Sequence, residues 1–448
     1  MDTHRFLRFA SLPLLMAAAA CSADAGGSGS NPQTQPPTST PSTTVPSARS
    51  EKPREKTPAA TPNDVAALTG DGRAFGAKLY GALRKDPALT KKNIFLSPHS
   101  IHTAFAMLYA GAQGSTATSM ASALDYSLPQ DRLHAAMNAL DLALASRATA
   151  QSNGSGSDGK GFRLAVANSL WSEKDFVFET PYLDTLAVNY DAGVNLLDFR
   201  HDPAAAADTI NRWIEEKTEN RIQKMLSSLD PSTELVLVNA VYFNAAWRLP
   251  FEASATANAT FHGLDGDTSV PTMKSGSMYG RYAKTKDYDA VALPYEGGAV
   301  EMIAIAPTVG TLDAFESGFD RAAFDAVVDG LKGGQIDLTI PRFTIKGDTI
   351  SLKPALSAFG MAEAFTERAN FHGVTAQEGF HVFDAAHKAF VNVDEKGTEA
   401  AAATAIVAGT TSVGPTPEPL HVDRPFLFAI RDVPTGAMLF LGRVTAPE

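Results

Sequence analysis

Hydrophobic residues in the first third of the chain follow the spacing of helices. One set recurs every four residues, at Phe75, Leu79 and Leu83, and predicts a helix there. Ser97-Pro98 is a typical helix start, because serine caps the first turn and proline is tolerated within it. Asp202-Pro203 predicts a further helix for the same reason.

Strand patterns dominate the rest of the chain. Residues 235–243 are apolar at nearly every position, as in a central strand that is covered on both faces. Because helices come first, strands come later and the two do not alternate regularly, the sequence predicts an α+β fold. Further strands are expected at 336–345, 380–393, 426–431 and 437–443, with a turn over 433–436.

Two polar residues stand where these patterns predict burial. His387 shares one strand face with four apolar residues, and Asn239 lies in the middle of the apolar central strand. A buried polar side chain without a partner costs roughly 2 kcal/mol or more. The simplest solution is that His387 and Asn239 contact each other, with Ser97 and Ser100 nearby. Each alone is more often a core residue with a satisfied side chain than a functional site.

The first 21 residues have the pattern of an export signal. Arg5 and Arg8 precede an apolar stretch that ends at Ala20 and is too short for a membrane helix. Cys21 follows directly and is the one cysteine of the chain. This position resembles the lipidated cysteine of bacterial lipoproteins, and an ordinary cleaved signal is the alternative. We expect an exported protein that is either extracellular or held at the cell envelope by a lipid on Cys21.

Composition divides the remainder into two parts. Residues 22–63 are rich in proline, serine and threonine and carry almost no large apolar side chain. Such a segment cannot bury enough surface to fold, so we expect a disordered tether ahead of a folded domain over 64–448. The net charge of −11 argues against a nucleic-acid partner. A single cysteine excludes a disulfide framework and a cysteine-based metal site.

Motifs for catalysis are missing from the sequence. It has no metalloprotease helix signature, no serine-hydrolase elbow and no phosphate-binding glycine loop. Ser97, His99, Ser100 and His102 cluster in sequence, but helix capping and packing explain them more simply. We therefore expect no enzymatic activity, no cofactor and no bound metal.

An unusual segment runs from Asp394 to Pro417. It follows a predicted buried strand and consists largely of small or β-branched residues. Alanine propensity favours a helix. As a strand, the segment would present one face of mostly small side chains, able to enter an existing sheet: Thr398, Ala400, Ala402, Thr404 and Ile406.

At this point the chain resembles the serpin family over nearly all of 64–448. Residues 395–405 resemble the loop hinge of inhibitory members almost letter for letter. The resemblance implies the serpin fold: an N-terminal helical bundle around a large central, mostly antiparallel β-sheet, with an exposed reactive-centre loop. Four further segments resemble family motifs in the right order, namely 93–101 (the shutter), 237–247 (the strand from shutter to breach), 423–428 and 440–443 (the closing strands).

The resemblance also implies an activity. Inhibitory serpins are monomers that offer a loop as bait to a serine protease, or in some cases a cysteine protease, and trap the acyl-enzyme by inserting the cleaved loop into the central sheet. The alternative is a non-inhibitory serpin that serves as a binding or chaperone protein. The hinge discriminates between them, because non-inhibitory relatives commonly carry proline, charge or bulk where this chain has Thr398 and four alanines.

Site residues follow from the same resemblance. The hinge comprises Glu395, Gly397, Thr398, Ala400, Ala401, Ala402 and Ala403. The shutter comprises Ser97, Ser100, Asn239 and His387, and the breach comprises Trp247 and Arg342, with Arg342 expected to pair with Glu395.

The bond that a protease would cut is found by counting. The usual loop length, counted from Glu395, places it at Thr411-Ser412. Counting back from Arg424-Pro425 points nearer Gly414, so the far side of this loop is longer than usual. We prefer Thr411-Ser412, because insertion constrains the hinge side directly. An uncharged Thr411 suits proteases with small specificity pockets, of the elastase or subtilisin type.

Overall fold

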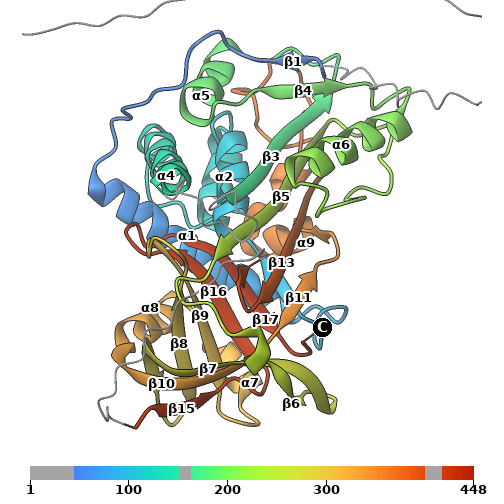
Figure 1. Ribbon diagram of the computed structural model, residues 1–448. Coiled ribbons are helices and arrows are strands. Elements are labelled where there is room, and N and C mark those ends of the chain that lie inside the picture. The colour runs from blue at the N-terminus through green and yellow to red at the C-terminus, as the bar shows by residue number, and fades with distance from the viewer. Residues whose placement is uncertain (1–44, 151–162, 399–415, 448) are drawn as a thin grey trace, which may run out of the picture. The chain divides into compact units, whose positions relative to one another are not determined.

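Figure 1 presents the computed structural model, which describes residues 45–150, 163–398 and 416–447. This part of the chain contains short 3₁₀ or π turns at 253–255, 357–361 and 362–365. The helices of this part of the chain are α1 (Pro62–Leu83), α2 (Pro98–Tyr109), α3 (Gly114–Ala123), α4 (Gln130–Ala150), α5 (Thr180–Tyr190), α6 (Pro203–Lys217), α7 (Leu312–Ser317), α8 (Arg321–Gly330) and α9 (Lys353–Leu356).

The first sheet, here called the central sheet, has the strand order β1-β4-β3-β5-β14-β13-β11, and β12 pairs with β13. Most of its neighbouring strands are antiparallel, but two pairs are parallel, β3 with β4 and β5 with β13. Its strands are β1 (Ser47–Ala48), β3 (Arg163–Glu173), β4 (Val194–Leu197), β5 (Leu235–Ala246), β11 (Phe343–Lys346), β12 (Ile350–Ser351), β13 (Asp384–Asp394) and β14 (Gly397–Thr398).

The second sheet has the order β15-β10-β7-β8-β9-β16-β17-β2, with β6 paired to β7. Its strands are β2 (Ile94–Leu96), β6 (Ala257–Gly263), β7 (Gly266–Lys284), β8 (Tyr288–Pro294), β9 (Val300–Pro307), β10 (Lys332–Pro341), β15 (Glu418–His421), β16 (Phe426–Asp432) and β17 (Met438–Val444). Helices and two sheets in this arrangement confirm the predicted α+β class.

Strand β5 is buried along its whole length, as its apolar sequence predicted. Side chains alternate between two hydrophobic clusters, because successive residues of a strand point to opposite faces. Val236, Val238 and Ala240 pack with Ile210 and Ile214 of α6. The intervening apolar residues of β5 belong to the larger cluster on the other face, which includes α1 and α2.

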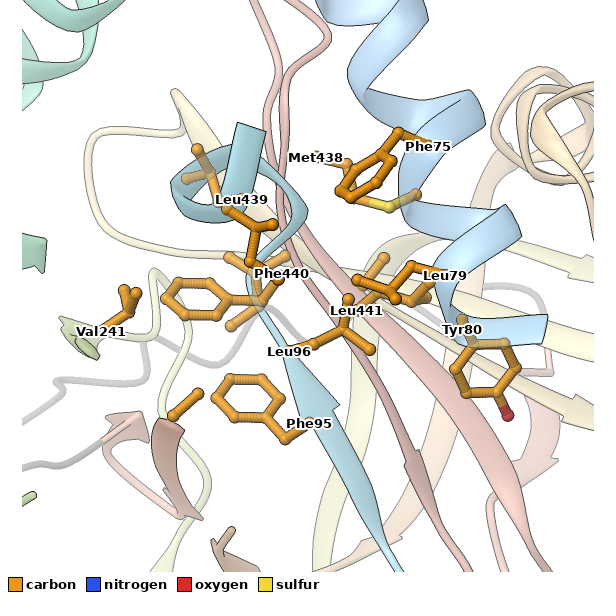
Figure 2. Close-up of a cluster of buried hydrophobic side chains, with 14 of the residues drawn as sticks. Phe75, Leu79, Tyr80, Phe95, Leu96, Val241, Met438, Leu439, Phe440 and Leu441 are labelled. Carbon is orange, nitrogen blue, oxygen red and sulfur yellow. The ribbon is translucent and has the colours of Figure 1, made fainter. Parts of the chain in front are cut away.

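Figure 2 shows the part of this larger cluster that joins helix α1 to the second sheet. Phe75 and Leu79 of α1 lie close to Met438 and Leu441 of β17, and Phe95 of β2 stacks on Phe440 with centroids 5.0 Å apart. The predicted spacing of Phe75, Leu79 and Leu83 is therefore the buried stripe of an amphipathic helix. Position 76 of this helix holds a glycine because Pro98 packs closely there: a Cβ on residue 76 would meet Pro98 at 2.7 Å.

The folded unit begins at Val45, earlier than the predicted boundary at residue 64. Ser47 and Ala48 form β1, an edge strand that pairs with β4. The carbonyl of Pro46 accepts a hydrogen bond from the Leu196 amide at 2.8 Å. We call residues 45–60 the N-terminal strap, because they pair with β4 and then run over the surface of α5 and α4.

Polar contacts hold the N-terminal strap to these helices. Lys52 forms an ion pair with Asp184 of α5 at 2.8 Å. Arg54 forms an ion pair with Asp141 of α4 at 2.6 Å and donates to the side-chain oxygen of Asn138 at 2.9 Å. The prediction of a disordered tether is therefore wrong for residues 45–63, because composition carries no information about partners elsewhere in the chain.

Two predicted strands also differ from the structure. The stretch 336–345 is split between β10 and β11, which belong to different sheets and meet at Pro341 and Arg342. The stretch 380–393 becomes a strand only at Asp384. Just before it, the Val382 amide donates to the Ala364 carbonyl at 3.1 Å, so the chain there is bonded outside the sheet.

Candidate functional site

The central sheet changes its pairing along the boundary between β5 and β13. Residues 384–390 of β13 pair directly with residues 236–242 of β5. Farther along, β14 lies between the two strands and pairs antiparallel with both. Thr398 is opposite Ala245 on one side and Val393 on the other. Strand β14 is thus a short strand between β5 and β13, which we call the wedge. Beyond it, β5 and β13 pair directly with each other.

Gly397 fits this wedge because it has no side chain. A Cβ at this position would meet the Ala245 carbonyl oxygen at 2.2 Å. Thr398 is fully buried, and its hydroxyl shares a hydrogen bond with the Tyr295 hydroxyl at 2.7 Å. The Asp394 carboxylate accepts hydrogen bonds from the amides of Lys396 and Gly397 and shapes the turn between β13 and β14.

Trp247 joins this turn to the end of β5. Its indole Nε1 donates to the Asp394 carbonyl at 2.9 Å, and its amide donates to the Lys396 carbonyl at 2.8 Å. Its ring stacks on Tyr295 with centroids 4.4 Å apart. Trp247 therefore contacts the end of β13 and the turn that follows it, although sequence alone assigned it to this place only through family resemblance.

Arg342 and Glu395 form an ion pair at the same end of the sheet, with 2.8 Å between Nη2 and Oε2. The carboxylate is almost completely buried, whereas the arginine side chain is about half exposed. Thr256 donates to the second carboxylate oxygen at 2.6 Å. This threonine was missed in the sequence, because nothing in its local pattern points to a partner so distant along the chain.

A buried polar network lies where β5 and β13 pair directly. The His387 and Asn239 side chains are hydrogen-bonded to each other across the two strands. Asn239 donates to the Ser100 hydroxyl at 2.6 Å, and Asn168 of β3 joins the same group. The predicted contact between Asn239 and His387 is therefore present. Asn168 was missed, although a polar residue in an apolar strand is the signal that singled out Asn239.

The His387 imidazole is neutral in this network. The Ser97 amide donates to its Nε2 at 3.3 Å, so Nδ1 carries the proton and donates to Asn239. Burial lowers the pKa of His387 to about 3. The Ser97 hydroxyl donates to the Leu439 carbonyl at 2.7 Å and accepts from the Ser100 amide. Among the residues that the structure describes, no base is directed at the Ser97 hydroxyl, so the hydrogen bonds of this network hold β5, β13 and α2 together and do not form a catalytic pair.

Some predicted site residues lie outside the described residues: Cys21, Ala400, Ala401, Ala402, Ala403, Thr411 and Ser412. Within the described ranges, no three histidine, cysteine, aspartate or glutamate side chains gather as a metal site would require. The helices in those ranges include none with the length and apolar character for crossing a bilayer.

Comparison with known proteins identifies the family. Residues 71–447 match the model of the serpin (serine protease inhibitor) family. An uncharacterized serpin-like protein of Thermococcus kodakarensis is 34% identical over 415 residues, which covers 92% of this chain and 93% of that protein. The leukocyte elastase inhibitor of Sus scrofa is 31% identical over 395 residues, which covers 85% and 99% of the two chains.

A solved structure with the same fold is that of human thyroxine-binding globulin. It has a TM-score of 0.73 and 26% sequence identity, and the match covers 86% of this chain and 99% of that one. The family match extends over most of the folded unit, including the second sheet, every strand of the central sheet except β1, and the turn around Trp247. The chain therefore belongs to the serpin family.

Proposed function

We propose that the chain is a suicide-substrate inhibitor of serine proteases, which traps its target by inserting a cleaved loop into the central sheet. The observation that carries this proposal is the wedge β14. Gly397 and Thr398 already lie between β5 and β13, where the path of an inserted strand would begin. A cleaved loop would only need to continue along that path.

The covalent step is the ordinary acylation of a serine protease. The protease serine oxygen attacks the carbonyl carbon of Thr411, and the bond from that carbon to the Ser412 nitrogen breaks. Ser412 leaves as a new amino terminus, with its proton delivered by the protease histidine. Insertion of the loop then moves the ester away before water hydrolyses it, and distortion of the oxyanion hole stalls deacylation.

The register of β14 predicts where each loop residue would go. Pairing Thr398 with Ala245 and extending the antiparallel ladder brings Thr404 opposite both Asn239 and His387. The hydrogen bond between Asn239 and His387 would have to break, and the Thr404 hydroxyl would offer a replacement partner. Residues 400–403, all alanine, would pass between residues 240–243 of β5 and their counterparts on β13.

Hydrogen bonding favours the inserted state. Direct pairing of β5 with β13 is one ladder, whereas an inserted strand makes two. From Thr398 to Thr411 the loop would extend about 43 Å at roughly 3.3 Å per residue. A protease attached at Thr411 would therefore be carried from one end of the central sheet past the other.

The target class follows from the residues before the proposed bond. Val407, Ala408, Gly409 and Thr411 are small or uncharged, so a protease with an acidic specificity pocket has no basic side chain to bind. A small-pocket enzyme of the elastase or subtilisin type fits best. The likeness to a leukocyte elastase inhibitor supports this choice.

We further propose that the protein is exported and acts as a monomer outside the cytoplasm, held at the cell envelope by a lipid on Cys21. The support is the basic and apolar pattern of residues 1–20, followed by the one cysteine in the chain. Metabolic labelling with a palmitate analogue tests this assignment. Labelling should disappear in the Cys21→Ser variant.

The inhibitory function is tested by incubating the full chain with pancreatic elastase and with subtilisin. A complex that survives a denaturing gel, together with a released peptide that begins at Ser412, is the expected result. Thr411→Pro is the matched control, since proline fits the specificity pockets of both proteases poorly and makes this bond resistant to cleavage without altering the described sheet. Quantitative cleavage at this bond with the protease left fully active would contradict inhibition.

A second candidate is a serpin fold that binds a ligand without inhibiting a protease, as the name of thyroxine-binding globulin indicates for that relative. The thermal midpoint of the cleaved chain separates the candidates. An inserted loop should raise the midpoint by tens of degrees, because the sheet gains a strand. An unchanged midpoint after cleavage would favour the binding protein.

A further inference from the structure

A cavity of about 300 Å³ lies beside the turn between β13 and β14 and has no role in the proposed inhibition. Trp247 at the end of β5 forms one wall, and Met278 of β7 and Leu293 of β8 form others. This volume is at the lower end of the range for small-ligand cavities, which are typically lined by apolar and aromatic side chains. We call it the Trp247 cavity.

Apolar side chains at the rim of the Trp247 cavity are unusually accessible. Leu249 is 53% exposed and Tyr279 is 66% exposed, and both line the cavity. Most other large apolar side chains in the described part of the chain are covered. An apolar group bound in the cavity would extend over both rim residues and remove their surfaces from water.

Positive charge is in excess around the Trp247 cavity. The buried Glu301 carboxylate accepts from Arg281 at 3.2 Å and from Arg431 at 2.8 Å, so two guanidinium groups share one negative charge. Arg248 also lines the cavity and is exposed, and no carboxylate among the described residues lies within ion-pair distance of it. The polar edge of the cavity therefore favours an anion.

We propose that the Trp247 cavity binds a small amphipathic acid, with its ring or short hydrocarbon body against Trp247 and Met278 and its acidic group at Arg248 and Arg281. Binding at this site goes beyond the inhibitory function and does not depend on it. The site is also linked to the hinge, because Trp247 donates hydrogen bonds to the carbonyls of Asp394 and Lys396. A bound acid would restrict the Trp247 ring and hold this turn in place.

The test is calorimetric titration of the full chain with 1-naphthoate and with its neutral counterpart 1-naphthalenemethanol. We expect the acid to bind at least tenfold more tightly than the alcohol. Met278→Trp, which fills the cavity from its partly exposed rim, should weaken both ligands at least tenfold. Arg248→Ala should weaken only the acid, and Arg212→Ala on α6 should change neither.

Three results would overturn the proposal: no measurable binding of either probe, equal affinity for the acid and the alcohol, or unchanged binding in Met278→Trp. A thermal melt of each variant establishes that it is folded before titration. Protease inhibition is not part of this readout, so failure of the ligand site and failure of the inhibitory function remain distinguishable.

Discussion

Arg342 and Glu395 form an ion pair beside the turn between β13 and β14, with 2.8 Å between the guanidinium and the carboxylate. Glu395 is almost completely buried, and its neighbours Asp394 and Lys396 are held by Trp247. The turn between β13 and β14 is therefore held by an ion pair and by an aromatic side chain together. The ion pair and the hydrogen bonds of Trp247 both involve residues directly before the wedge β14.

Arg342→Ala should destabilise the protein because it leaves the buried Glu395 carboxylate with only the Thr256 hydroxyl and no opposite charge. We expect the free energy of unfolding to fall by about 2 kcal/mol, since losing the partner of a buried group costs roughly 1–3 kcal/mol. Urea unfolding measures the change. Arg342→Lys keeps the charge and should recover most of it, and an unaltered unfolding midpoint in Arg342→Ala would show that the pair contributes nothing.

Thr398→Arg should convert the proposed inhibitor into a substrate. Thr398 is fully buried against Tyr295, and a guanidinium cannot be buried there without a partner. We expect the yield of covalent complex with elastase to fall at least tenfold while cleavage of the loop continues. Thr398→Ser keeps the hydroxyl and should behave like the unmodified chain. Equal complex yields in the Arg and Ser variants would exclude insertion through this wedge.

Buried histidines should make stability depend on pH. Burial lowers the pKa of His102 and His134 to about 4 and that of His387 to about 3. In the unfolded chain histidine titrates near pH 6.5, so between about pH 6.5 and about pH 4 the unfolded state binds more protons than the native state. The stabilisation is complete above the unfolded pKa and is lost as the pH falls towards the native one.

As the pH falls from about 6.5 towards about 4, each of these histidines should therefore reduce the free energy of unfolding by about 1 kcal/mol per pH unit. Urea unfolding at about pH 7 and about pH 5 measures the slope. His387→Gln retains a hydrogen-bonding side chain and removes one titrating group. Between about pH 7 and about pH 5, the free energy of unfolding of this variant should therefore fall by roughly 2 kcal/mol less than that of the unmodified chain. A slope identical to that of the unmodified chain would mean that His387 does not contribute.

The N-terminal strap should stabilise the folded unit. Arg54 contacts both Asp141 and Asn138 of α4, and its side chain is only 20% exposed. Arg54→Ala should lower the free energy of unfolding by about 1 kcal/mol, as is typical for a partly buried polar contact. A chain that begins at residue 59 should have a lower thermal midpoint than one that begins at residue 45. Equal thermal midpoints of these two truncated chains would show that the N-terminal strap does not stabilise the folded unit.

Local patterns in the sequence determined much of this molecule. The apolar run over 235–243 predicted a strand covered on both faces, and Ser97-Pro98 predicted a helix start that the structure contains as the cap of α2. The need of Asn239 and His387 for hydrogen-bond partners also followed from local patterns, because each is a polar residue in an apolar strand. These features depend on side-chain periodicity and on the cost of burying polar groups, and both can be read from neighbouring residues.

Tertiary structure alone decided which distant segments meet. The stretch 336–345 has one continuous strand pattern, yet its two halves pair in different sheets, because periodicity records that a face is buried and not which partner covers it. The N-terminal strap has the composition of a tether and folds because β4, α5 and α4 supply its hydrogen bonds. The cavity beside Trp247 likewise exists only where β5, β7 and β8 converge, since strand pairing over long sequence separations is set by the packing of the whole molecule.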